Sequence, residues 1–168
     1  MNKKINVAIV VLSDRCYKKI YKDLSGKEIK KIIQKNSISS DWKISDYKIL
    51  PDNKNLIKKH LIHLVDKKKV DFIITSGGTG ITKRDITPEA TKEIIEKELV
   101  GISEMLRFES YKKNKNAILS RGITGTRKQS LIINLPGSVN AVKEELPLVL
   151  PFVKHIIDLL NGIAHHKK

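Results

Sequence analysis

Hydrophobic and polar positions along this chain switch repeatedly between strand-like and helix-like spacing. Residues 5–12, 70–75 and 131–135 are short apolar runs rich in β-branched side chains, which is typical of strands buried on both faces of a sheet. Residues 42–50 alternate apolar and polar side chains, which predicts a less buried or irregular strand that Pro51 ends. The pattern therefore predicts a buried sheet with residues 5–12 as a central strand.

The segments between these strands carry apolar residues at the spacing of a helix face. The first helix is predicted to follow the loop 13–23, with Asp23 or Ser25 as its N-cap. Pro147 and Pro151 should kink or split the last helix, because proline removes a backbone donor and clashes with the preceding turn. Further helices are predicted over residues 53–67, 102–113 and 139–160.

This alternation of strands and helices indicates a three-layer α/β/α fold with a mainly parallel sheet and helices on both faces. A chain of 168 residues is suited to one core, so we interpret residues 1–163 as a single domain and 164–168 as a short basic tail. Ligands of such sheets bind beyond the carboxyl ends of the strands. The loops that leave the strands are therefore the candidates for chemistry.

The composition favours a soluble, cytoplasmic protein without a membrane partner. No apolar run approaches the ~18 residues of a membrane-spanning helix, and residues 1–4 lead straight into a strand-like stretch without a secretory signal. The single cysteine, Cys16, excludes an internal disulfide and a cysteine zinc site. A reactive thiol needs an activating partner, so we interpret Cys16 as a small buried or loop residue.

The formal charge of +15 raises the possibility of nucleic-acid binding, because clustered cations bind phosphate backbones by releasing counterions. The lysines, however, are spread along most of the chain instead of forming one tract, and only 5% of residues are aromatic. Stacking platforms for single strands would therefore be scarce. We predict no nucleic-acid partner, and a solvated lysine-rich surface that draws anionic ligands toward a site.

The most informative loop is Thr75-Ser76-Gly77-Gly78-Thr79-Gly80, which directly follows a predicted buried strand. Its glycines let the backbone take positive φ and approach a ligand closely, while backbone N–H groups and the Ser76 and Thr79 hydroxyls can surround an anion. The spacing matches neither a Walker loop nor a dinucleotide-binding motif. A tight turn without a ligand is the structural alternative.

Two aspartates stand on loops that leave predicted strands. Asp85 follows the glycines and precedes a helix that we expect to begin at Pro88 behind a Thr87 cap, and Asp52 follows the strand 42–50. Two carboxylates beside a phosphate pocket are suited to Mg²⁺, a hard cation that takes oxygen ligands. Asp52 could instead serve as a turn or N-cap residue, and Asp85 could pair with the basic residues just before it.

Seven segments, spread over nearly the whole chain, together resemble the MogA/MoaB family of molybdopterin-binding proteins, which includes bacterial molybdopterin adenylyltransferase and domains of gephyrin. The glycine segment, the Asp-x-Thr-Pro-Glu-Ala element and the Asn-Leu-Pro-Gly turn form a specific combination. The segments are Leu12-Ser13-Asp14-Arg15, Asp23-Leu24-Ser25-Gly26, Pro51-Asp52, Thr75-Ser76-Gly77-Gly78-Thr79-Gly80, Arg84-Asp85-Ile86-Thr87-Pro88-Glu89-Ala90, Leu119-Ser120-Arg121 and Leu131-Ile132-Ile133-Asn134-Leu135-Pro136-Gly137.

The resemblance implies an activity. Proteins similar to this chain transfer AMP from Mg-ATP to the terminal phosphate of molybdopterin and release pyrophosphate, before molybdenum is inserted. The stretch Arg127-Lys128-Gln129 looks more like the adenylyltransferase branch than the MoaB branch. Thr126 departs from the family, where an aliphatic residue is usual at that position.

The resemblance also implies roles for individual residues. Asp52 and Asp85 would hold or orient Mg²⁺ and the reacting phosphates, and Arg127 and Lys128 are candidate anion contacts. The remaining candidates fall into three groups: a phosphate cradle of Thr75, Ser76, Gly77, Gly78, Thr79 and Gly80, a nucleotide side of Ser13 and Asp14, and a pterin or nucleotide pocket shaped by Ser120, Asn134, Pro136 and Gly137.

The implied ligands are molybdopterin and ATP with Mg²⁺, in a homotrimer that hands its product to a molybdenum-insertion enzyme. Two alternatives stay open. One is a non-catalytic molybdopterin-binding or scaffold protein of the MoaB type, which would bind the pterin without releasing pyrophosphate. The other is a nucleic-acid-binding protein, whose affinity would fall steeply with salt.

Overall fold

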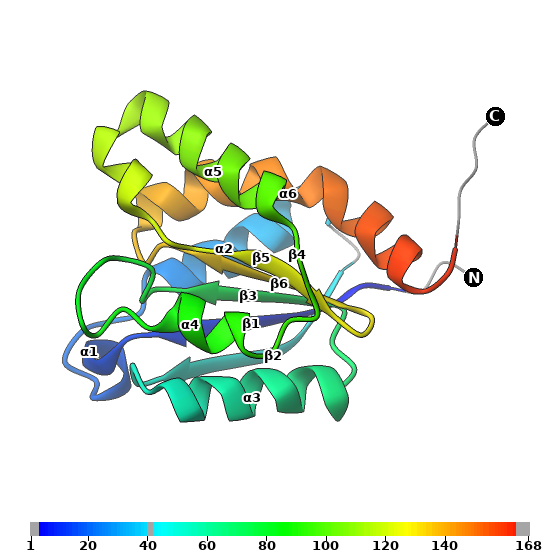
Figure 1. The fold of residues 1–168 in the computed structure, drawn as a ribbon, viewed down its shortest axis with the longest axis horizontal. Helices are drawn as coiled ribbons and strands as arrows, with labels where there is room; N and C mark the ends of the chain where they lie inside the picture. Colours follow the sequence, from blue (N-terminus) through cyan, green and yellow to red (C-terminus); the bar gives the residue numbers. More distant parts are fainter. Residues whose placement is uncertain (1–3, 40–41, 164–168) are drawn as a thin grey trace.

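A computed structural model describes residues 4–39 and 42–163 and is built around one six-stranded sheet (Figure 1). The expected basic tail, 164–168, lies outside the described residues. The strands follow the order β2-β1-β3-β6-β5-β4 across the sheet. Their bounds are Asn6–Leu12 (β1), Lys43–Leu50 (β2), Phe72–Ser76 (β3), Lys97–Glu98 (β4), Thr124–Arg127 (β5) and Ser130–Leu135 (β6).

The sheet is mainly parallel, which confirms the predicted fold class. Strands β2, β1, β3 and β6 run parallel to one another, whereas β5 is antiparallel to β6 and β4 is antiparallel to β5. The two antiparallel strands were not predicted. β4 has only two residues and β5 reads Thr-Gly-Thr-Arg, so neither carries the apolar run that marks a buried strand.

The helices form the two outer layers (Figure 1). Helices α2, α5 and α6 cover one face of the sheet, and α3 and α4 cover the other. The bounds are Asp14–Tyr17 (α1), Ser25–Lys35 (α2), Lys54–Asp66 (α3), Thr87–Lys92 (α4), Val100–Lys113 (α5), the 3-10 helix Lys115–Leu119 (η1) and Val139–Leu160 (α6).

The central strands fill a core on each face. Successive side chains of a strand point to opposite faces, so Val7, Ile9 and Val11 of β1 pack under α2 and α6, while Ala8 and Val10 pack against α3. Because β1, β3 and β6 run parallel, their carboxyl ends lie at the same edge of the sheet. The chemistry predicted for the strand-exit loops is thereby brought to one place.

The last helix was predicted to be kinked or split at its prolines. Helix α6 is continuous from Val139 to Leu160, so the prolines do not split it. Pro147 and Pro151 are four residues apart and both face solvent, where water can satisfy the carbonyls that lose their helical donors. The opposite side of the helix packs Leu146 and Val149 into the core. Burial of that apolar stripe holds the helix together despite the prolines.

Helix starts also differ in detail from the prediction. The loop 13–23 contains the four-residue helix α1. Ser25 is the first residue of α2, and the Asp23 carboxylate accepts a hydrogen bond from Gly26 N–H at 2.8 Å, so Asp23 supplies the cap. Thr87 is the first helical residue of α4 rather than its N-cap.

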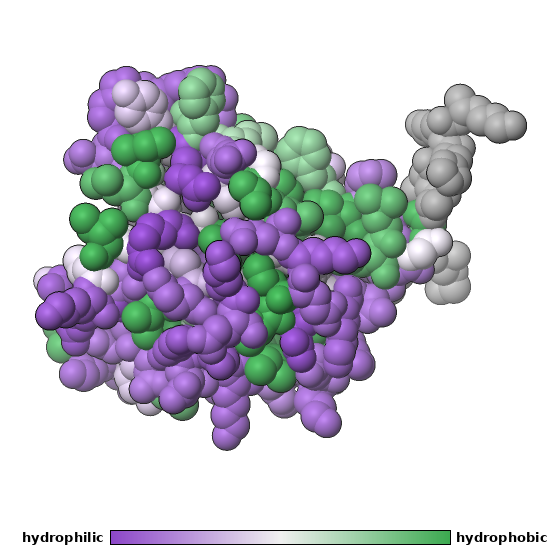
Figure 2. Space-filling model, viewed as in Figure 1, coloured by the Kyte–Doolittle hydropathy of each residue, from purple (hydrophilic) through white to green (hydrophobic). Residues whose placement is uncertain are grey.

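The described part of the chain contains no helix long and apolar enough to cross a membrane. Figure 2 shows one largely hydrophilic face, with hydrophobic residues gathered over the C-terminal part of α6. Phe152 and Leu159 are exposed in this part of the helix. Exposed apolar residues are common on the surfaces of folded proteins.

Candidate functional site

The exits of three parallel strands meet at the glycine loop. Gly77 N–H donates to the Leu135 carbonyl at 3.0 Å, which ties β3 to the end of β6. Gly77 has φ +106°, and a Cβ added there would lie 2.3 Å from the Leu12 carbonyl oxygen at the end of β1. A Cβ added to Gly137 would lie 3.3 Å from Gly77 Cα. Only glycine permits the close approach at Gly77, whereas at Gly137 a side chain would fit tightly.

In the glycine loop, Gly77 to Gly80, all four carbonyl oxygens accept hydrogen bonds from other parts of the protein. Thr87 Oγ1 donates to Gly77 O at 2.8 Å, and Thr87 N–H donates to Gly78 O at 3.1 Å. Arg121 N–H donates to Thr79 O at 2.8 Å, and Arg121 Nε donates to Gly80 O at 2.7 Å. Within the described residues, the N–H groups of Gly78 and Thr79 have no such partner. These two N–H groups are therefore available to an anion, whereas those of Gly77 and Gly80 are bound to Leu135 and Asp85.

Arg121 holds this loop in place, and the sequence analysis gave it no role. Besides the Gly80 carbonyl, its guanidinium donates to the Asp85 carbonyl at 2.6 Å and forms an ion pair with Glu89 at the start of α4. One side chain thus joins the glycine loop, the Asp85 loop and α4. The sequence held one sign of a role for Arg121, since it lies in the family-like segment Leu119-Ser120-Arg121. Its contact with Gly80 could not be predicted, because the two residues are 41 positions apart in the chain.

Replacing Arg121 by Ala is expected to lower kcat/KM for the reaction proposed below about 100-fold, because misplaced binding groups cost that much. Lys should rescue only partly, since one ammonium cannot span two carbonyls and a carboxylate as a planar guanidinium does. Steady-state kinetics checks this. The matched control is Arg127→Ala at the other end of the sheet, which should stay within about twofold; equal losses in both variants would contradict a specific role for Arg121.

Asp14 and Asp52 form a reciprocal pair beside the loop. Asp14 N–H donates to Asp52 Oδ2 at 3.1 Å, and Asp52 N–H donates to Asp14 Oδ1 at 3.0 Å. Arg84 Nη2 donates to Asp14 Oδ2 at 2.6 Å. The other oxygen of Asp52, Oδ1, lies 3.6 Å from where a Cβ on Gly78 would be. The Asp52 carboxylate therefore faces the glycine loop, and its N-cap role is taken by Asn53.

The pKa values of the two predicted metal ligands shift in opposite directions. Burial raises the pKa of Asp52, and the negative charges of Asp14 and Asp85 raise it further. Burial also disfavours the charged form of Asp85, but hydrogen bonds from Thr82 and from Gly80 N–H outweigh it and lower the Asp85 pKa. A cation placed between these groups would relieve the repulsion that acts on Asp52.

The donor set fits a hard cation such as Mg²⁺. Asp52 and Asp85 offer carboxylate oxygens next to an anion-binding loop, and clustered negative charge acts on Asp52. Among residues 4–39 and 42–163, no three acidic, histidine or cysteine side chains converge as a metal site. Mg²⁺ commonly uses one or two carboxylates with substrate phosphates and water, so this sparse set is compatible with a metal that arrives with a nucleotide.

A cavity of about 1290 Å³ opens over the loop between α1, the N-terminus of α2, η1 and the start of α6. Its size allows two ligands to lie side by side, because one drug-sized ligand needs roughly 300–1,000 Å³. The structure brings ten of the predicted site residues to this wall: Ser13, Ser76, Gly77, Gly78, Thr79, Gly80, Asp85, Ser120, Pro136 and Gly137.

Two further predicted residues lie beneath the cavity rather than in its wall. Asn134 is 3% exposed, and its amide donates to Thr75 Oγ1 at 2.9 Å and to Thr91 Oγ1 at 3.0 Å. These contacts join β6, β3 and α4 directly under the glycine loop. Thr75 and Asn134 are buried and do not line the cavity, so the structure supports a role in positioning the loop, whereas their predicted binding role stays a prediction.

The predicted anion contacts Arg127 and Lys128 lie at the opposite end of the sheet. β5 is antiparallel to β6, so Arg127 pairs with Ser130 at the start of β6, far from the strand exits. Arg127 Nη2 contacts Asp66 Oδ2 at 3.0 Å, and Lys128 Nζ contacts Asp66 Oδ1 at 2.9 Å. Both cations thus neutralise the end of α3 and are not brought into this site, which corrects that prediction.

Glu145 of α6 is a buried acid that the sequence analysis did not single out. It lines the cavity, is 4% exposed and accepts a hydrogen bond from Ser110 Oγ of α5 at 2.9 Å. Burial raises the pKa of Glu145 to about 7, the Ser110 hydrogen bond and Arg107 act in the opposite direction, and Glu144 adds to the rise. The group therefore titrates near neutrality.

This raised pKa predicts a loss of stability as pH increases. Between pH 4.5 and about 7 the unfolded chain ionises Glu145 while the folded chain keeps it protonated, so the folded state binds more protons. At ~1.4 kcal/mol per pKa unit, the loss of stability above pH 7 is roughly 3.5 kcal/mol at most. Urea unfolding at pH 5 and pH 8 measures the free energy of unfolding, which should fall less between these pH values for Glu145→Gln than for the unaltered protein. An equal fall in both proteins would contradict this prediction.

A mainly parallel α/β sheet that has a glycine loop with two available N–H groups and acidic side chains at its carboxyl edge is typical of proteins that bind phosphate-bearing ligands. Comparison with known proteins narrows the class. Residues 8–155 match the family described as "Probable molybdopterin binding domain". The match covers most of the chain, and this chain belongs to that family.

Several relatives resemble the chain over nearly its full length. The molybdopterin adenylyltransferase of Helicobacter pylori is 41% identical over 162 residues, covering 94% of this chain and 89% of the relative. Molybdenum cofactor biosynthesis protein B of Bacillus cereus is 35% identical over 157 residues, covering 92% and 89%. The crystal structure of the molybdopterin biosynthesis enzyme MoaB from Thermus thermophilus superposes with a TM-score of 0.85 at 35% identity, covering 94% of this chain and 97% of that one.

Proposed function

We propose that this protein is a molybdopterin adenylyltransferase, which transfers AMP from ATP to the terminal phosphate of molybdopterin. An oxygen of the pterin phosphate attacks the α-phosphorus of ATP, a new phosphorus–oxygen bond forms, and the bond to the β-phosphate oxygen breaks to release pyrophosphate. Such a transfer depends on positioning and charge neutralisation more than on a covalent enzyme group.

The observation that carries the proposal is the glycine loop, Gly77 to Gly80, in which the protein binds all four carbonyls while the N–H groups of Gly78 and Thr79 have no partner among the described residues. Phosphate groups carry the negative charge that such a loop attracts. The cavity over the loop is large enough for a pterin and a nucleotide together. The names of relatives at 41% identity, from Helicobacter pylori and Methanocaldococcus jannaschii, support the same activity.

Asp52 and Asp85 would hold Mg²⁺ together with phosphate oxygens. When bound, this metal would supply neutralisation of the charge that accumulates on the phosphates. Thr82 fixes the Asp85 carboxylate through hydrogen bonds of 2.8 Å from its N–H and 2.7 Å from its hydroxyl. Arg84 and the backbone of Asp52 fix Asp14, so the acids are oriented before ligands arrive.

Incubation of the purified protein with molybdopterin, Mg²⁺ and ATP tests the proposal directly. Mass spectrometry should detect adenylylated pterin that forms in equal amount to pyrophosphate. Pterin binding without adenylylated product, even at saturating ATP, would favour the MoaB-type scaffold instead. Tight oligonucleotide binding that weakens steeply with salt would favour the nucleic-acid alternative, whereas a flat salt response would remove it.

We further propose that the protein is a homotrimer that passes its product to a molybdenum-insertion enzyme, and that it acts in the cytoplasm. The support is the resemblance to the family, in which a trimer is usual. Light scattering should give three times the chain mass of 19.1 kDa. A mass of one chain that persists at micromolar concentration would contradict the trimer.

A further inference from the structure

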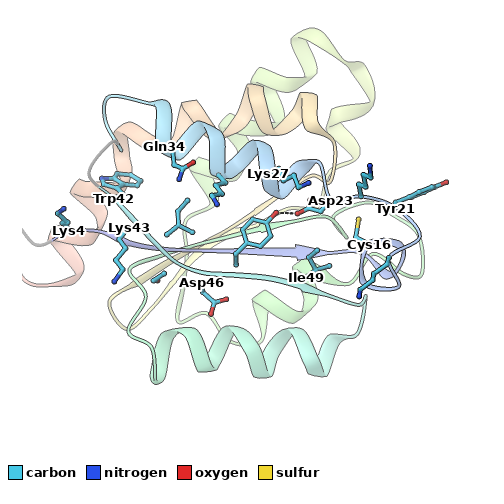
Figure 3. A pocket seen from close by; sticks show the side chains of 16 residues that line it. Lys4, Cys16, Tyr21, Asp23, Lys27, Gln34, Trp42, Lys43, Asp46 and Ile49 are labelled. Atoms are coloured by element: carbon cyan, nitrogen blue, oxygen red, sulfur yellow. Dashed lines mark hydrogen bonds between the residues drawn. The ribbon is translucent and has the colours of Figure 1, made fainter.

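A second cavity, of about 1090 Å³, runs along strand β2 beneath helix α2 (Figure 3). Trp42 and Lys43 lie at one end of this groove, and Cys16 and Tyr21 lie at the other. Apolar side chains of β2 and the residue before it line the groove. They are Trp42, Ile44, Tyr47 and Ile49.

The groove is surrounded by lysines that have no acidic partner. Six lysines line it, and within the described residues none of them forms an ion pair: Lys4, Lys19, Lys22, Lys27, Lys30 and Lys43. The two aspartates of the groove are already engaged. Asp46 pairs with Lys68, and Asp23 binds the Gly26 N–H and the Tyr47 hydroxyl. The groove therefore presents net positive charge to a ligand.

The shape of the groove favours an extended ligand. β2 has eight residues, and at about 3.3 Å per residue the strand spans roughly 26 Å. That length matches a peptide strand of about eight residues and exceeds a single nucleotide. β2 is also an edge strand, so one side of its backbone is unpaired in the sheet. Edge strands of this kind bind extended peptides by adding a strand.

The chemistry of the groove favours an acidic peptide over two other occupants. Ile44 and Ile49 are aliphatic and suit apolar side chains. Three aromatic residues also line the groove, but Tyr21 and Trp42 lie at its opposite ends, so only Tyr47 lies between them for the successive bases of a single strand to stack on. Pairing of the groove with the same groove of a second copy would bring its six unpaired lysines against their counterparts, so like charges would oppose that contact. Carboxylates that alternate with apolar side chains complement lysine walls and an apolar floor.

The groove is continuous with the reaction cavity. Cys16, Tyr21, Lys22 and Asp23 line both cavities. A partner seated in the groove would therefore stand beside the opening of the site that holds the pterin and nucleotide. Its placement would leave the glycine loop itself uncovered, because no residue of that loop lines the groove.

We propose that the lysine groove along β2 is a docking site for an extended acidic segment of a partner protein, next to the mouth of the reaction cavity. Carboxylates of the segment pair with lysines from α2 and β2, and its apolar side chains pack on Ile44, Tyr47 and Ile49. This docking function goes beyond the proposed reaction, because binding of a partner in the groove requires neither substrate nor turnover.

Trp42 provides a direct readout, since it is the only tryptophan of the chain and lines the groove. The probe is a synthetic peptide of about eight residues that alternates glutamate with leucine, used at physiological ionic strength. The full protein should show a saturable change in Trp42 emission, and a peptide that alternates lysine with leucine should give none. Absence of a saturable change would overturn the proposal.

Two double variants with the same change in charge separate docking from general attraction. Lys27→Glu with Lys30→Glu, on α2, should weaken peptide binding at least about tenfold. Lys59→Glu with Lys67→Glu, on α3 and just after it, should change it less than about twofold. Equal loss in both variants would overturn the proposal. So would displacement of the peptide by oligothymidylate or pyrophosphate, or a change in oligomer mass confined to the α2 variant.

Pyrophosphate release keeps this test separate from the proposed reaction. The α2 variant should keep its release rate within about twofold, because Lys27 and Lys30 do not line the reaction cavity. Peptide binding without turnover would support the groove and contradict the adenylyltransferase. Turnover without peptide binding would support the adenylyltransferase and contradict the docking groove.

Discussion

Replacement of Asp85 by Asn is expected to lower kcat for adenylyl transfer about 10³-fold while the protein stays folded. Asp85 lines the cavity beside Gly80, and hydrogen bonds from Thr82 keep its carboxylate charged and aimed. Asn preserves the shape and can accept one of these bonds, but it removes the negative charge that would hold the metal. Loss of one preorganised electrostatic group typically costs 10²–10³ in rate.

The control for this variant is Asp66→Asn. Asp66 is an acid of the same kind that pairs with Arg127 and Lys128 at the far end of the sheet. Its kcat should stay within about twofold of the unaltered protein. Rates come from single-turnover formation of adenylylated pterin, and thermal unfolding verifies that both variants are folded. Normal turnover of Asp85→Asn would refute the role of this carboxylate.

Replacement of Gly77 by Ala is expected to destabilise the fold by about 3 kcal/mol and to lower kcat/KM at least about 100-fold. Ala at φ +106° is strained, and its Cβ would lie 2.3 Å from the Leu12 carbonyl oxygen. The end of β1 and the glycine loop would have to separate to relieve this overlap. A shift of about 1 Å in a binding loop is enough for a loss of that size.

Gly162→Ala separates the clash from the backbone strain. Gly162 also has positive φ, at +74°, but nothing lies within 4 Å of a Cβ placed there. This control should lose only about 1 kcal/mol and keep full activity. Denaturant unfolding and steady-state kinetics measure both effects. Similar losses of activity in the two variants would contradict the close approach of β1 to the loop.

The parallel sheet could be predicted because its strands are buried on both faces and therefore read as apolar runs. β1, β3 and β6 are of this kind, and the predicted ranges differ from the observed ones by only one or two residues. β5 could not be found in this way, because Thr124 and Gly125 carry no apolar pattern and are buried by tertiary packing, such as that of Gly125 against Ile95. The continuity of α6 was missed for a related reason: its stability depends on tertiary burial.

The candidate site was predictable where its residues are close in sequence. Gly77 to Gly80 and Asp85 lie in the same connection between β3 and α4, and their residue types alone suggest phosphate and metal binding. Arg121 reaches this loop from 41 residues away, and Asp14 meets Asp52 across 38 residues, so only the fold reveals these contacts. Arg127 was wrongly placed in the site. Its positive charge suggests an anion contact, but the sequence does not show at which end of the sheet Arg127 lies.

The most direct test of the central claim is pyrophosphate release measured with and without molybdopterin at saturating Mg-ATP. The proposed reaction predicts release only when molybdopterin is present, in equal amount to the adenylylated pterin formed. Molybdopterin that binds to the cavity without any release of pyrophosphate would contradict the claim that this glycine loop serves adenylyl transfer.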